Sequence, residues 1–282
     1  MLYIVIVFVL SVLYVWTLYN IPIFVVGVNS LRRSGRKGRK VSALCVESLP
    51  FVSIVVPVKD EETVVGRLLE ALLKLDYPRE KLEIVIVEDG SVDKTVEICR
   101  AYARRYSGQI KLLCQSLSNG KPSALNCALK HVRGEIVAVF DADSVPESDV
   151  LMRVARYFED SSMVAVQGRV DAINREQNML TKFISYEEAV RYETYIGGKD
   201  ALKLFVPLTG SCYFIRRSVL DEVGGWDNDS LSEDMELTAR LTERGYRVKY
   251  ASDVRCLQEN PSTLAQLFRQ RARWFRGCME VG

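Results

Sequence analysis

The sequence predicts an α/β domain with a largely parallel sheet, attached to an N-terminal transmembrane helix. Two observations lead to this prediction. Residues 1–28 contain no charged side chain, and an apolar run of about 20 residues suffices to cross a bilayer. From residue 52 onward, short runs of β-branched residues alternate with segments of helical periodicity. Such alternation implies parallel strands that are joined by right-handed crossovers.

The charge distribution points to a membrane and away from nucleic acid. The chain of 282 residues has a net charge of +2. Six basic residues and no acidic ones precede Glu47, so the rest of the chain carries 32 basic and 36 acidic residues. A nucleic-acid-binding protein would carry positive charge on its folded domain. We therefore expect no nucleic acid partner and favour anionic membrane lipid as the partner of the basic cluster. The cluster consists of Arg32, Arg33, Arg36, Lys37, Arg39 and Lys40.

We expect three segments: a transmembrane helix over residues 1–28, a basic juxtamembrane linker over 29–50, and a globular domain over 51–282. A secretory signal peptide would have a charged start, a shorter apolar core and a small-residue cleavage site, none of which is evident. By the positive-inside rule the linker belongs on the cytoplasmic side. The predicted protein is thus a single-pass membrane protein with a cytoplasmic domain.

Cysteine and histidine usage excludes several kinds of site. The seven cysteines form no Cys-x-x-Cys pair, which suits reduced thiols in the cytosol. They are Cys45, Cys99, Cys114, Cys127, Cys212, Cys256 and Cys278. With a single histidine, zinc-ligand or Ser-His-Asp chemistry has little to work with. We expect that residue, His131, to be an ordinary surface residue.

The first half alternates regularly between the two kinds of element. Strands are predicted at 52–58, 82–87, 110–113 and 135–140, and helices at 64–75, 93–106 and 121–132. Because the strands are almost continuously apolar, both faces of the sheet should be covered, as in a Rossmann-like layer. No Gly-x-Gly-x-x-Gly and no Gly-Lys-Ser/Thr phosphate loop follows any strand. This argues against a dinucleotide-dependent dehydrogenase and a P-loop enzyme.

The pattern becomes less regular after the fourth strand. Val145-Pro146-Glu147 resembles a helix start, and residues 163–168 are typical of a strand. A long amphipathic helix is predicted over 175–196, and apolar runs around a Gly-Ser turn occupy 206–215. Ser232 is a candidate N-cap of a helix that ends near Gly245.

Two carboxylates, Asp141 and Asp143, follow the fourth strand directly. In extended geometry both side chains leave the same face of the chain, so both can approach one hard cation such as Mg²⁺ or Mn²⁺. A cation that carries a diphosphate would fit this arrangement. The alternative is a structural one, because aspartates are also common in turns and at helix starts.

Other acids follow neighbouring strands or begin a later helix. Asp60 and Glu61 follow the first strand, Asp89 follows the second, and Glu233 and Asp234 begin the helix after Ser232. In an open α/β sheet the ligand site lies beyond the carboxyl ends of the strands, so we expect these acids to converge on one cleft. The two acids at the helix start have a second interpretation, since they also complement the helix dipole.

Near the end of the chain, Gln270, Arg273 and Trp274 stand at helical positions i, i+3 and i+4 and share one face. Arginine pairs with phosphate oxygens, and tryptophan offers a flat surface to an apolar ring face. The neighbouring Arg269, Arg271 and Arg276 allow a different interpretation, that of an amphipathic helix on a membrane surface.

Taken together, the motifs resemble those of the family 2 glycosyltransferases of the GT-A fold, most closely the membrane-bound cellulose, chitin and hyaluronan synthases. The similarity spans residues 52–274. Four motifs occur in the order of that family: Val-Pro-Val-Lys-Asp-Glu-Glu, Glu-Asp-Gly-Ser, Asp-Ala-Asp, and Ser-Glu-Asp followed by Gln-Arg-Ala-Arg-Trp. The resemblance implies the nucleotide-diphospho-sugar transferase fold.

The resemblance also implies roles for the matching residues. The uracil and ribose pocket would be lined by Pro57, Glu61 and Asp89, and Lys121 would contact the diphosphate. Asp141 and Asp143 would hold the nucleotide and its Mg²⁺ or Mn²⁺, with Asp143 as the direct ligand. Asp234 would be the general base, and Glu233 in the same motif would bind substrate. Gln270, Arg273 and Trp274 would close over the diphosphate and support the acceptor sugar.

The implied activity is that of a membrane-anchored, metal-dependent inverting glycosyltransferase, which moves a sugar from a UDP-sugar to a saccharide or lipid-linked acceptor. Two alternatives stay open: a non-processive transferase that acts on polyprenyl phosphate or another lipid-linked acceptor, and a non-catalytic nucleotide-sugar-binding subunit. Lys59-Asp60 departs from the residues common in the family, which bears on donor preference. Since Gly282 comes eight residues after Trp274, without channel-forming helices, we expect either a truncated synthase or an enzyme that does not secrete its product.

Overall fold

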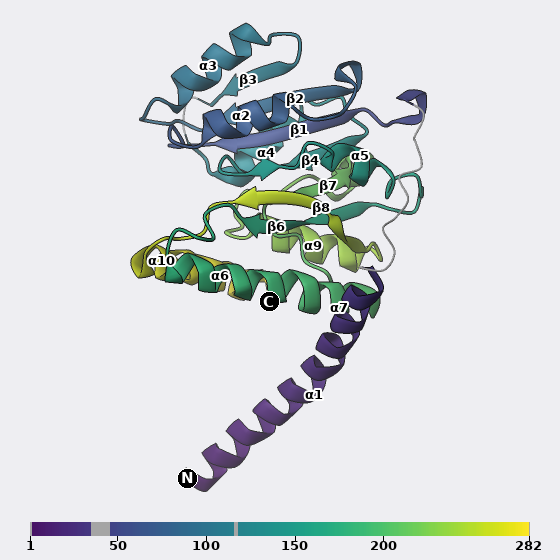
Figure 1. The fold of residues 1–282 in the computed structure, drawn as a ribbon, viewed down its shortest axis with the longest axis vertical. Helices are drawn as coiled ribbons and strands as arrows, with labels where there is room; N and C mark the ends of the chain where they lie inside the picture. Colours follow the sequence, from purple (N-terminus) through teal and green to yellow (C-terminus); the bar gives the residue numbers. More distant parts are fainter. Residues whose placement is uncertain (1, 35–45, 116–117, 282) are drawn as a thin grey trace.

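The computed structural model describes residues 2–34, 46–115 and 118–281. In that part of the chain one mixed sheet runs through the whole globular domain, and a long helix projects from one end (Figure 1). Most of the basic cluster (Arg36, Lys37, Arg39 and Lys40) and Cys45 lie outside the described residues. The cysteines within them are free thiols, and His131 is exposed as expected.

The sheet has eight strands in the order β3-β2-β1-β4-β7-β6-β8-β5. Their bounds are β1 Val52–Val58, β2 Leu82–Glu88, β3 Ile110–Cys114, β4 Ile136–Val139, β5 Val145–Pro146, β6 Ala165–Ala172, β7 Tyr213–Arg216 and β8 Val248–Gln258. The first four strands pair in parallel, as predicted from their alternation with helices. β7 then pairs antiparallel with both β4 and β6, whereas β8 pairs parallel with β6.

The bounds of the helices are α1 Leu2–Ser34, α2 Val65–Leu73, α3 Thr95–Arg105, α4 Lys121–Leu129, α5 Val150–Ala155, α6 Met179–Val190, α7 Gly197–Ala201, α8 Arg217–Val223, α9 Glu233–Glu243 and α10 Leu264–Val281. In Figure 1, α2 and α3 lie beside the upper strands of the sheet, whereas α6, α7 and α10 lie at its lower end. Short 3₁₀ turns occupy Val46–Ser48 and Arg79–Lys81, and a π-helical segment occupies Arg191–Ile196. All four residues of β4 are fully buried, so both sheet faces are covered there, as its apolar sequence predicted.

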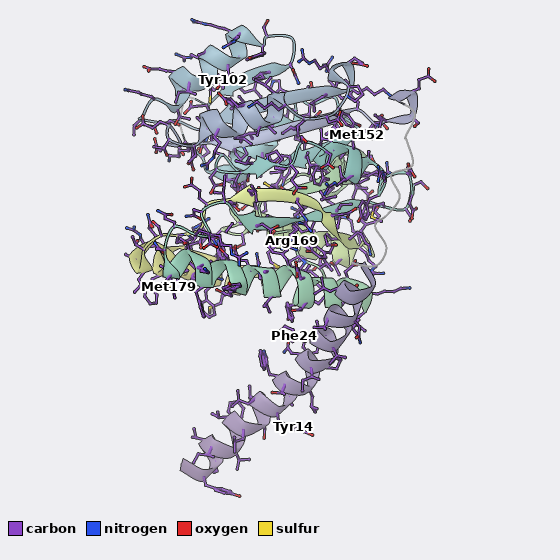
Figure 2. The ribbon with its side chains drawn as sticks, in the orientation of Figure 1. Tyr14, Phe24, Tyr102, Met152, Arg169 and Met179 are labelled. Atoms are coloured by element: carbon purple, nitrogen blue, oxygen red, sulfur yellow. The ribbon has the colours of Figure 1, made fainter. Side chains whose placement is uncertain are left out.

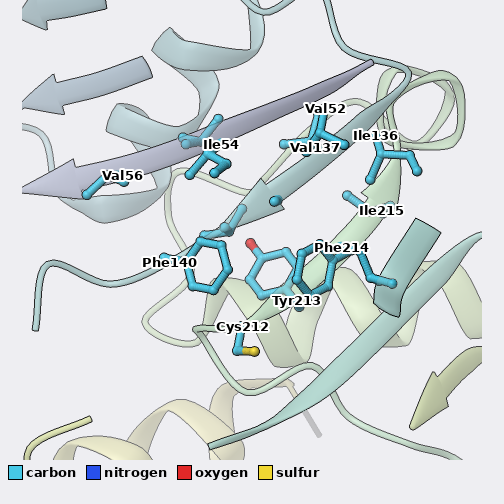
Figure 3. Close-up of a cluster of buried hydrophobic side chains, with 14 of the residues drawn as sticks. Val52, Ile54, Val56, Ile136, Val137, Phe140, Cys212, Tyr213, Phe214 and Ile215 are labelled. Carbon is cyan, nitrogen blue, oxygen red and sulfur yellow. The ribbon is translucent and has the colours of Figure 1, made fainter. Parts of the chain in front are cut away.

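The core is densest where the parallel and antiparallel parts of the sheet meet. Side chains of β1, β4 and β7 pack against one another there (Figure 3). Phe140 and Phe214 form an edge-to-face pair with ring centroids 5.8 Å apart, a favourable aromatic geometry. Because these strands are buried, the loops after β1 and β4 and the turn before β7 start from a rigid base.

The prediction of a helix start at Val145-Pro146-Glu147 is wrong. Val145 and Pro146 form β5, which pairs with β8, and the helix α5 begins only at Val150. β5 is the last strand in the sheet order. An edge strand tolerates proline because one side of it needs no N–H donor.

The predicted helix over 175–196 also differs from the structure. It begins at Met179, because Asn178 forms a capping box with Thr181. Its last turns are the π-helical segment Arg191–Ile196, which continues into α7. The strand β8 was not predicted.

The helix α1 is long enough and apolar enough to cross a membrane, with a mean hydropathy of 2.2 over its best window. It continues to Ser34, past the predicted end of the span. Its first part, including Tyr14, extends away from the domain, whereas Phe24 lies near the domain surface (Figure 2). Phe24 contacts Tyr195 with ring centroids 5.7 Å apart.

Two glycines allow α1 to dock tightly on the domain. A Cβ atom at Gly27 would lie 1.9 Å from the carbonyl oxygen of Thr194, and one at Gly198 would lie 2.1 Å from that of Ile23. Small residues permit this close backbone approach between helices. Ile23 is only 1% exposed, so the last turns of α1 belong to the packed domain.

Large apolar side chains are exposed on α6 and α10, which lie side by side at the end of the domain from which α1 departs (Figure 1). An ion pair of 2.8 Å between Arg271 and Glu187 joins the two helices. The exposed apolar residues are Met179, Phe183, Tyr186 and Val190 on α6, and Leu264, Phe268, Phe275 and Met279 on α10. Their spacing places those of each helix on one face.

Candidate active site

A lysine at the start of α4 holds carboxylates from two distant segments. Lys121 Nζ lies 2.7 Å from Asp141 Oδ1, just after β4, and 2.9 Å from Glu233 Oε1, the first residue of α9. Nζ also donates to the carbonyl oxygen of Gly210 at 3.0 Å. Burial alone would lower the pKa of Lys121, but the two carboxylates raise it well above its usual value. The lysine is therefore a fixed positive charge at the carboxyl edge of the sheet.

The turn Thr209-Gly210-Ser211 connects this cluster to the loop after β4. Ser211 Oγ accepts from the backbone N–H of Asp141 at 3.0 Å and bonds to Ser144 Oγ at 2.8 Å. Both serines are fully buried. Gly210 has a φ of +77°, which favours glycine. The turn and the acidic loop thus form one hydrogen-bonded unit.

Asp234 lies beside the same turn. Its Oδ1 accepts from the N–H of Met235 at 2.8 Å. Its Oδ2 faces Gly210, since a Cβ at that glycine would be 3.4 Å from Asp234 Oδ2 and 3.4 Å from Lys121 Nζ. The structure therefore brings Asp141, Glu233 and Asp234 together around Lys121 and Gly210.

Thr238 links the start of α9 to Leu208, the residue just before the Thr209-Gly210-Ser211 turn. Thr238 Oγ1 donates to the carbonyl oxygen of Asp234 at 2.7 Å and accepts from the N–H of Leu208 at 3.0 Å. Ser232 occupies the predicted N-cap position, but its side chain makes no capping hydrogen bond. Burial and the neighbouring Glu233 raise the pKa of Asp234 to about 6, although Lys121 opposes the shift. A carboxylate with this pKa is well suited to accept a proton near neutral pH.

Asp141 and Asp143 approach a single amide. Gln258 Nε2, at the end of β8, lies 2.9 Å from Asp143 Oδ1 and 3.5 Å from Asp141 Oδ2. Burial, followed by the charge of Asp141, raises the pKa of Asp143 to about 6. Two carboxylates under mutual repulsion are a charge arrangement that a divalent cation relieves.

A donor-bound Mg²⁺ or Mn²⁺ fits these residues. Among residues 2–34, 46–115 and 118–281, no group of three or more His, Cys, Asp or Glu side chains is arranged to hold a metal alone. Mg²⁺ in phosphoryl-binding sites commonly takes only one or two protein carboxylates, together with substrate phosphates and water. Asp141 is engaged by Lys121, which leaves Asp143 as the more available ligand.

Pro57 and Glu61 lie at the end of β1 and in the loop after it. Pro57 is half-buried in register with Val87 of β2. Burial, then the charges of Asp143 and Asp141, raises the pKa of Glu61 to about 7. Glu61 therefore shares the electrostatic field of the aspartate pair, although it comes from a different loop.

Asp89 lies beside the loop that precedes Lys121. Its carboxylate is buried and accepts from Ser118 Oγ at 2.8 Å and from the N–H groups of Asn119 and Gly120, both at 3.0 Å. These bonds hold the residues immediately before Lys121. The structure thus gives Asp89 a supporting contact to the segment that carries the lysine.

Gln270, Arg273 and Trp274 lie on α10, and within the part of the chain that the structure describes none of them bonds to the acid cluster. Arg271 stacks over the Trp274 ring at 4.9 Å. The helix is nevertheless close to the start of α9, because a Cβ at Gly277 would be 2.0 Å from Ser232 Oγ. α10 therefore approaches the start of α9 at Gly277, and the roles of Gln270, Arg273 and Trp274 stay a prediction.

Sequence reasoning missed three residues that shape the site: Thr209, Gly210 and Gln258. In the sequence the Gly-Ser turn stands out only as a break between apolar runs. Gln258 follows no recognisable motif, since its position depends on the unpredicted strand β8. The turn offered one available signal, a Thr-Gly-Ser sequence between two buried apolar stretches.

Comparisons with known proteins agree with this geometry. A family model described as "Glycosyltransferase like family 2" matches residues 50–277. The chain is 34% identical over 240 residues to the probable glycosyltransferase YdaM of Bacillus subtilis (strain 168), which covers 84% of this chain and 57% of YdaM. It is 35% identical over 266 residues to a beta-monoglucosyldiacylglycerol synthase of Nostoc sp. (strain PCC 7120 / SAG 25.82 / UTEX 2576), which covers 90% of this chain and 54% of that protein.

Among solved structures, the fold is similar to that of the mannosyltransferase PcManGT from Pyrobaculum calidifontis in complex with GDP-Man and Mn²⁺. The TM-score is 0.64 at 25% identity, over 89% of this chain and 69% of that one. The predicted GT-A fold is thereby confirmed. The chain spans about half the length of the curated relatives named above.

Proposed function

The chain belongs to glycosyltransferase family 2, and we propose that it transfers a sugar from a UDP-sugar to a hydroxyl group of a membrane-associated acceptor, with inversion at the anomeric carbon. The observation that carries this proposal is the meeting of Lys121, Asp141, Glu233 and Asp234 around Gly210. With Asp143 beside Asp141, this cluster offers one positive charge, a pair of metal-type carboxylates and a separate carboxylate, Asp234, of raised pKa. These are the groups that such a transfer requires.

In the proposed reaction Asp234 takes the proton of the acceptor hydroxyl. The hydroxyl oxygen attacks the anomeric carbon from the face opposite the nucleotide diphosphate, and the bond from that carbon to the diphosphate breaks. Asp234 is the suitable base because its Oδ2 faces Gly210, while the ion pairs of Lys121 in the described part of the chain go to Asp141 and Glu233. General base catalysis of this kind contributes about 10² to 10⁴ in rate.

The donor side uses the other charged groups. Asp143, with Asp141 beside it, would hold Mg²⁺ or Mn²⁺, which supplies electrostatic stabilisation of the departing diphosphate when bound. Lys121 lies within reach of the same region, and we assign it to diphosphate binding. Pro57, Glu61 and Asp89 line or support the nucleotide pocket in this proposal. Gln270, Arg273 and Trp274 border the acceptor side.

A membrane-embedded lipid is our first candidate for the acceptor. The apolar faces of α6 and α10 lie at the end of the domain from which α1 departs, which favours a domain that rests on the lipid surface (Figure 1). The similarity to a protein named as a glucosyldiacylglycerol synthase supports the same choice. We retain residues 1–28 as the membrane span, 29–50 as the juxtamembrane linker and 51–282 as the cytoplasmic catalytic domain.

The test is nucleotide diphosphate release by detergent-solubilised full chain. Donors are UDP-glucose, UDP-N-acetylglucosamine and GDP-mannose, each with diacylglycerol-containing vesicles, a soluble oligosaccharide or no acceptor. We expect UDP release that needs vesicles and Mn²⁺ or Mg²⁺ and stops with EDTA. Release that needs the oligosaccharide would replace the lipid acceptor by a saccharide. Donor binding without any release would favour a non-catalytic subunit.

A further inference from the structure

A buried tyrosine outside the reaction just described reaches the turn at the centre of the site. Tyr192 is 2% exposed, and its hydroxyl lies 2.9 Å from Thr209 Oγ1. Thr209 directly precedes Gly210, whose carbonyl oxygen accepts from Lys121, so this bond restrains the turn next to the lysine contact. Neither residue carries charge, and neither belongs to a motif that the sequence indicated.

Thr209 is held from a second direction as well. Its backbone N–H donates to Gln167 Oε1 at 2.8 Å, and the Gln167 amide nitrogen donates to the carbonyl oxygen of Ser211 at 3.0 Å. Gln167 is fully buried. Gln167 therefore restrains the backbone of the turn from one direction, and Tyr192 restrains the turn through the Thr209 side chain.

Tyr192 itself sits in an unusual piece of helix. It belongs to the π-helical segment Arg191–Ile196, a geometry that is rare and often found near functional sites. Its ring stacks on Tyr250, with centroids 6.1 Å apart and an interplanar angle of 24°. The Arg191 guanidinium lies over the same ring at 4.6 Å. The ring is thus clamped, and only the hydroxyl extends towards the turn.

The same segment receives the membrane helix. Thr194, two residues after Tyr192, is the contact of Gly27, and Gly198 is the contact of Ile23. A continuous set of contacts therefore leads from α1 through the π-helical segment and Tyr192 to Thr209. From there it reaches Gly210, whose carbonyl oxygen accepts from Lys121 and whose Cα faces Asp234 Oδ2.

We propose that Tyr192 is a positioning residue for catalysis: through Thr209 it sets the place of Gly210, and thereby the relative placement of Lys121 and Asp234, against the docked end of α1. This inference rests on the proposed function, because its readout is sugar transfer. Loss of the hydroxyl leaves the Thr209 side chain without this partner. The turn can then shift relative to Asp234, and misplacement of a base lowers the rate of the chemical step.

A double-mutant cycle tests the proposal. The variants are Tyr192→Phe, Thr209→Val and their combination, with Thr209→Ser as the conservative variant that keeps the hydroxyl. Tyr195→Phe is the matched control, because Tyr195 lies in the same π-helical segment but faces Phe24 of α1. Each protein is assayed in detergent for kcat at saturating donor and for the Kd of the donor.

We expect Tyr192→Phe and Thr209→Val each to lower kcat about three- to tenfold, the size of effect associated with one hydrogen bond. The donor Kd should stay unchanged, and the double variant should be no slower than either single one. Thr209→Ser and Tyr195→Phe should keep the wild-type kcat.

Two results would overturn the positioning role. One is a wild-type kcat in both Tyr192→Phe and Thr209→Val; the other is a double variant whose loss equals the product of the single losses. A wild-type protein that binds donor without turnover would instead contradict the proposed function, so the two failures are distinguishable.

Discussion

The two halves of the sheet build their parts of the site in different ways. In residues 52–144, the half that we propose binds the donor, parallel strands end in loops that carry charged side chains. In residues 145–281, the proposed acceptor half, antiparallel pairing places an uncharged turn and the start of α9 against those loops. The donor half thus contributes Lys121 and the aspartate pair, whereas the acceptor half contributes Asp234 and the turn that faces it. Substitutions in the donor half should affect donor binding, and those in the acceptor half should affect turnover.

The largest expected effect is in the acceptor half, at Asp234. Asp234→Asn removes the proton acceptor and should lower kcat by about 10² to 10⁴, with donor Kd unchanged. Isothermal titration with UDP and a steady-state assay measure the two quantities. Glu243→Gln, an exposed change on the same helix, should leave both at wild-type values. If Asp234→Asn lost donor affinity and kcat to the same extent, the assignment of binding to one half and turnover to the other would be contradicted.

Asp143→Asn is the corresponding change in the donor half. It removes the more available metal-type carboxylate, and we expect kcat/KM to fall about 10²-fold together with a weaker donor Kd. We expect Mn²⁺ to raise the melting temperature of the wild-type full chain, and Asp143→Asn should lose this rise. A variant that still responds to Mn²⁺ would show that the cation binds elsewhere.

Gly210→Ala tests the turn where the halves meet. The new Cβ would lie 3.4 Å from both Asp234 Oδ2 and Lys121 Nζ, at a φ of +77°. We expect kcat to fall about 10- to 100-fold. Gly224→Ala is the matched control, since its φ is +89° but open space surrounds the added atom. Both variants should lose similar stability, and only Gly210→Ala should lose activity.

The pH dependence of kcat also tests Asp234 as the general base. With a pKa of about 6, Asp234 is ionised at pH 7 and becomes protonated as the pH falls. kcat at saturating donor should therefore drop about tenfold per pH unit below pH 6. The profile is measured between pH 5 and 8 with metal in excess. A flat profile down to pH 5 would exclude a base of this pKa.

The smallest effect concerns stability without metal. The pKa of Asp143 is raised by folding, so its contribution to stability is present below pH 4 and is lost as the pH rises through about 6. In EDTA, Asp143→Asn should therefore melt about 2 to 4 °C above the wild type at pH 8. The difference should vanish at pH 4. Differential scanning fluorimetry in detergent measures both points, and an equal gap at both would contradict a charge effect.

More of the structure can be predicted from the sequence in the donor half than in the acceptor half, and the reason is physical. In the donor half each strand and helix has its own local signal, as in the apolar run of β4 followed by Asp141 and Asp143. The parallel pairing of those strands also follows from their alternation with helices. The convergence of the acids at one sheet edge is therefore predictable from the amino-acid sequence alone.

In the acceptor half the decisive contacts are nonlocal. Gln258 reaches Asp143 only because β8 pairs with β6 and β5, and such pairing leaves no local pattern. The role of Gly210 depends on Lys121 and Asp234, and the lysine is 89 residues away along the chain. Val145-Pro146 became a strand because β8 offered an edge. In each case tertiary contacts outweighed local propensity.

The tight docking of α1 at Gly27 and Gly198 has a consequence for acceptor choice. A catalytic domain joined to a membrane helix by a flexible linker alone would sample many heights above the bilayer. It could then act on any hydroxyl group nearby. Here α1 packs directly on the domain, so in the membrane orientation proposed above the reactive centre would stand at a fixed height over the bilayer. We therefore expect the enzyme to select acceptors by how far their hydroxyl group rises from the lipid surface, before any contact with the sugar-binding residues is made.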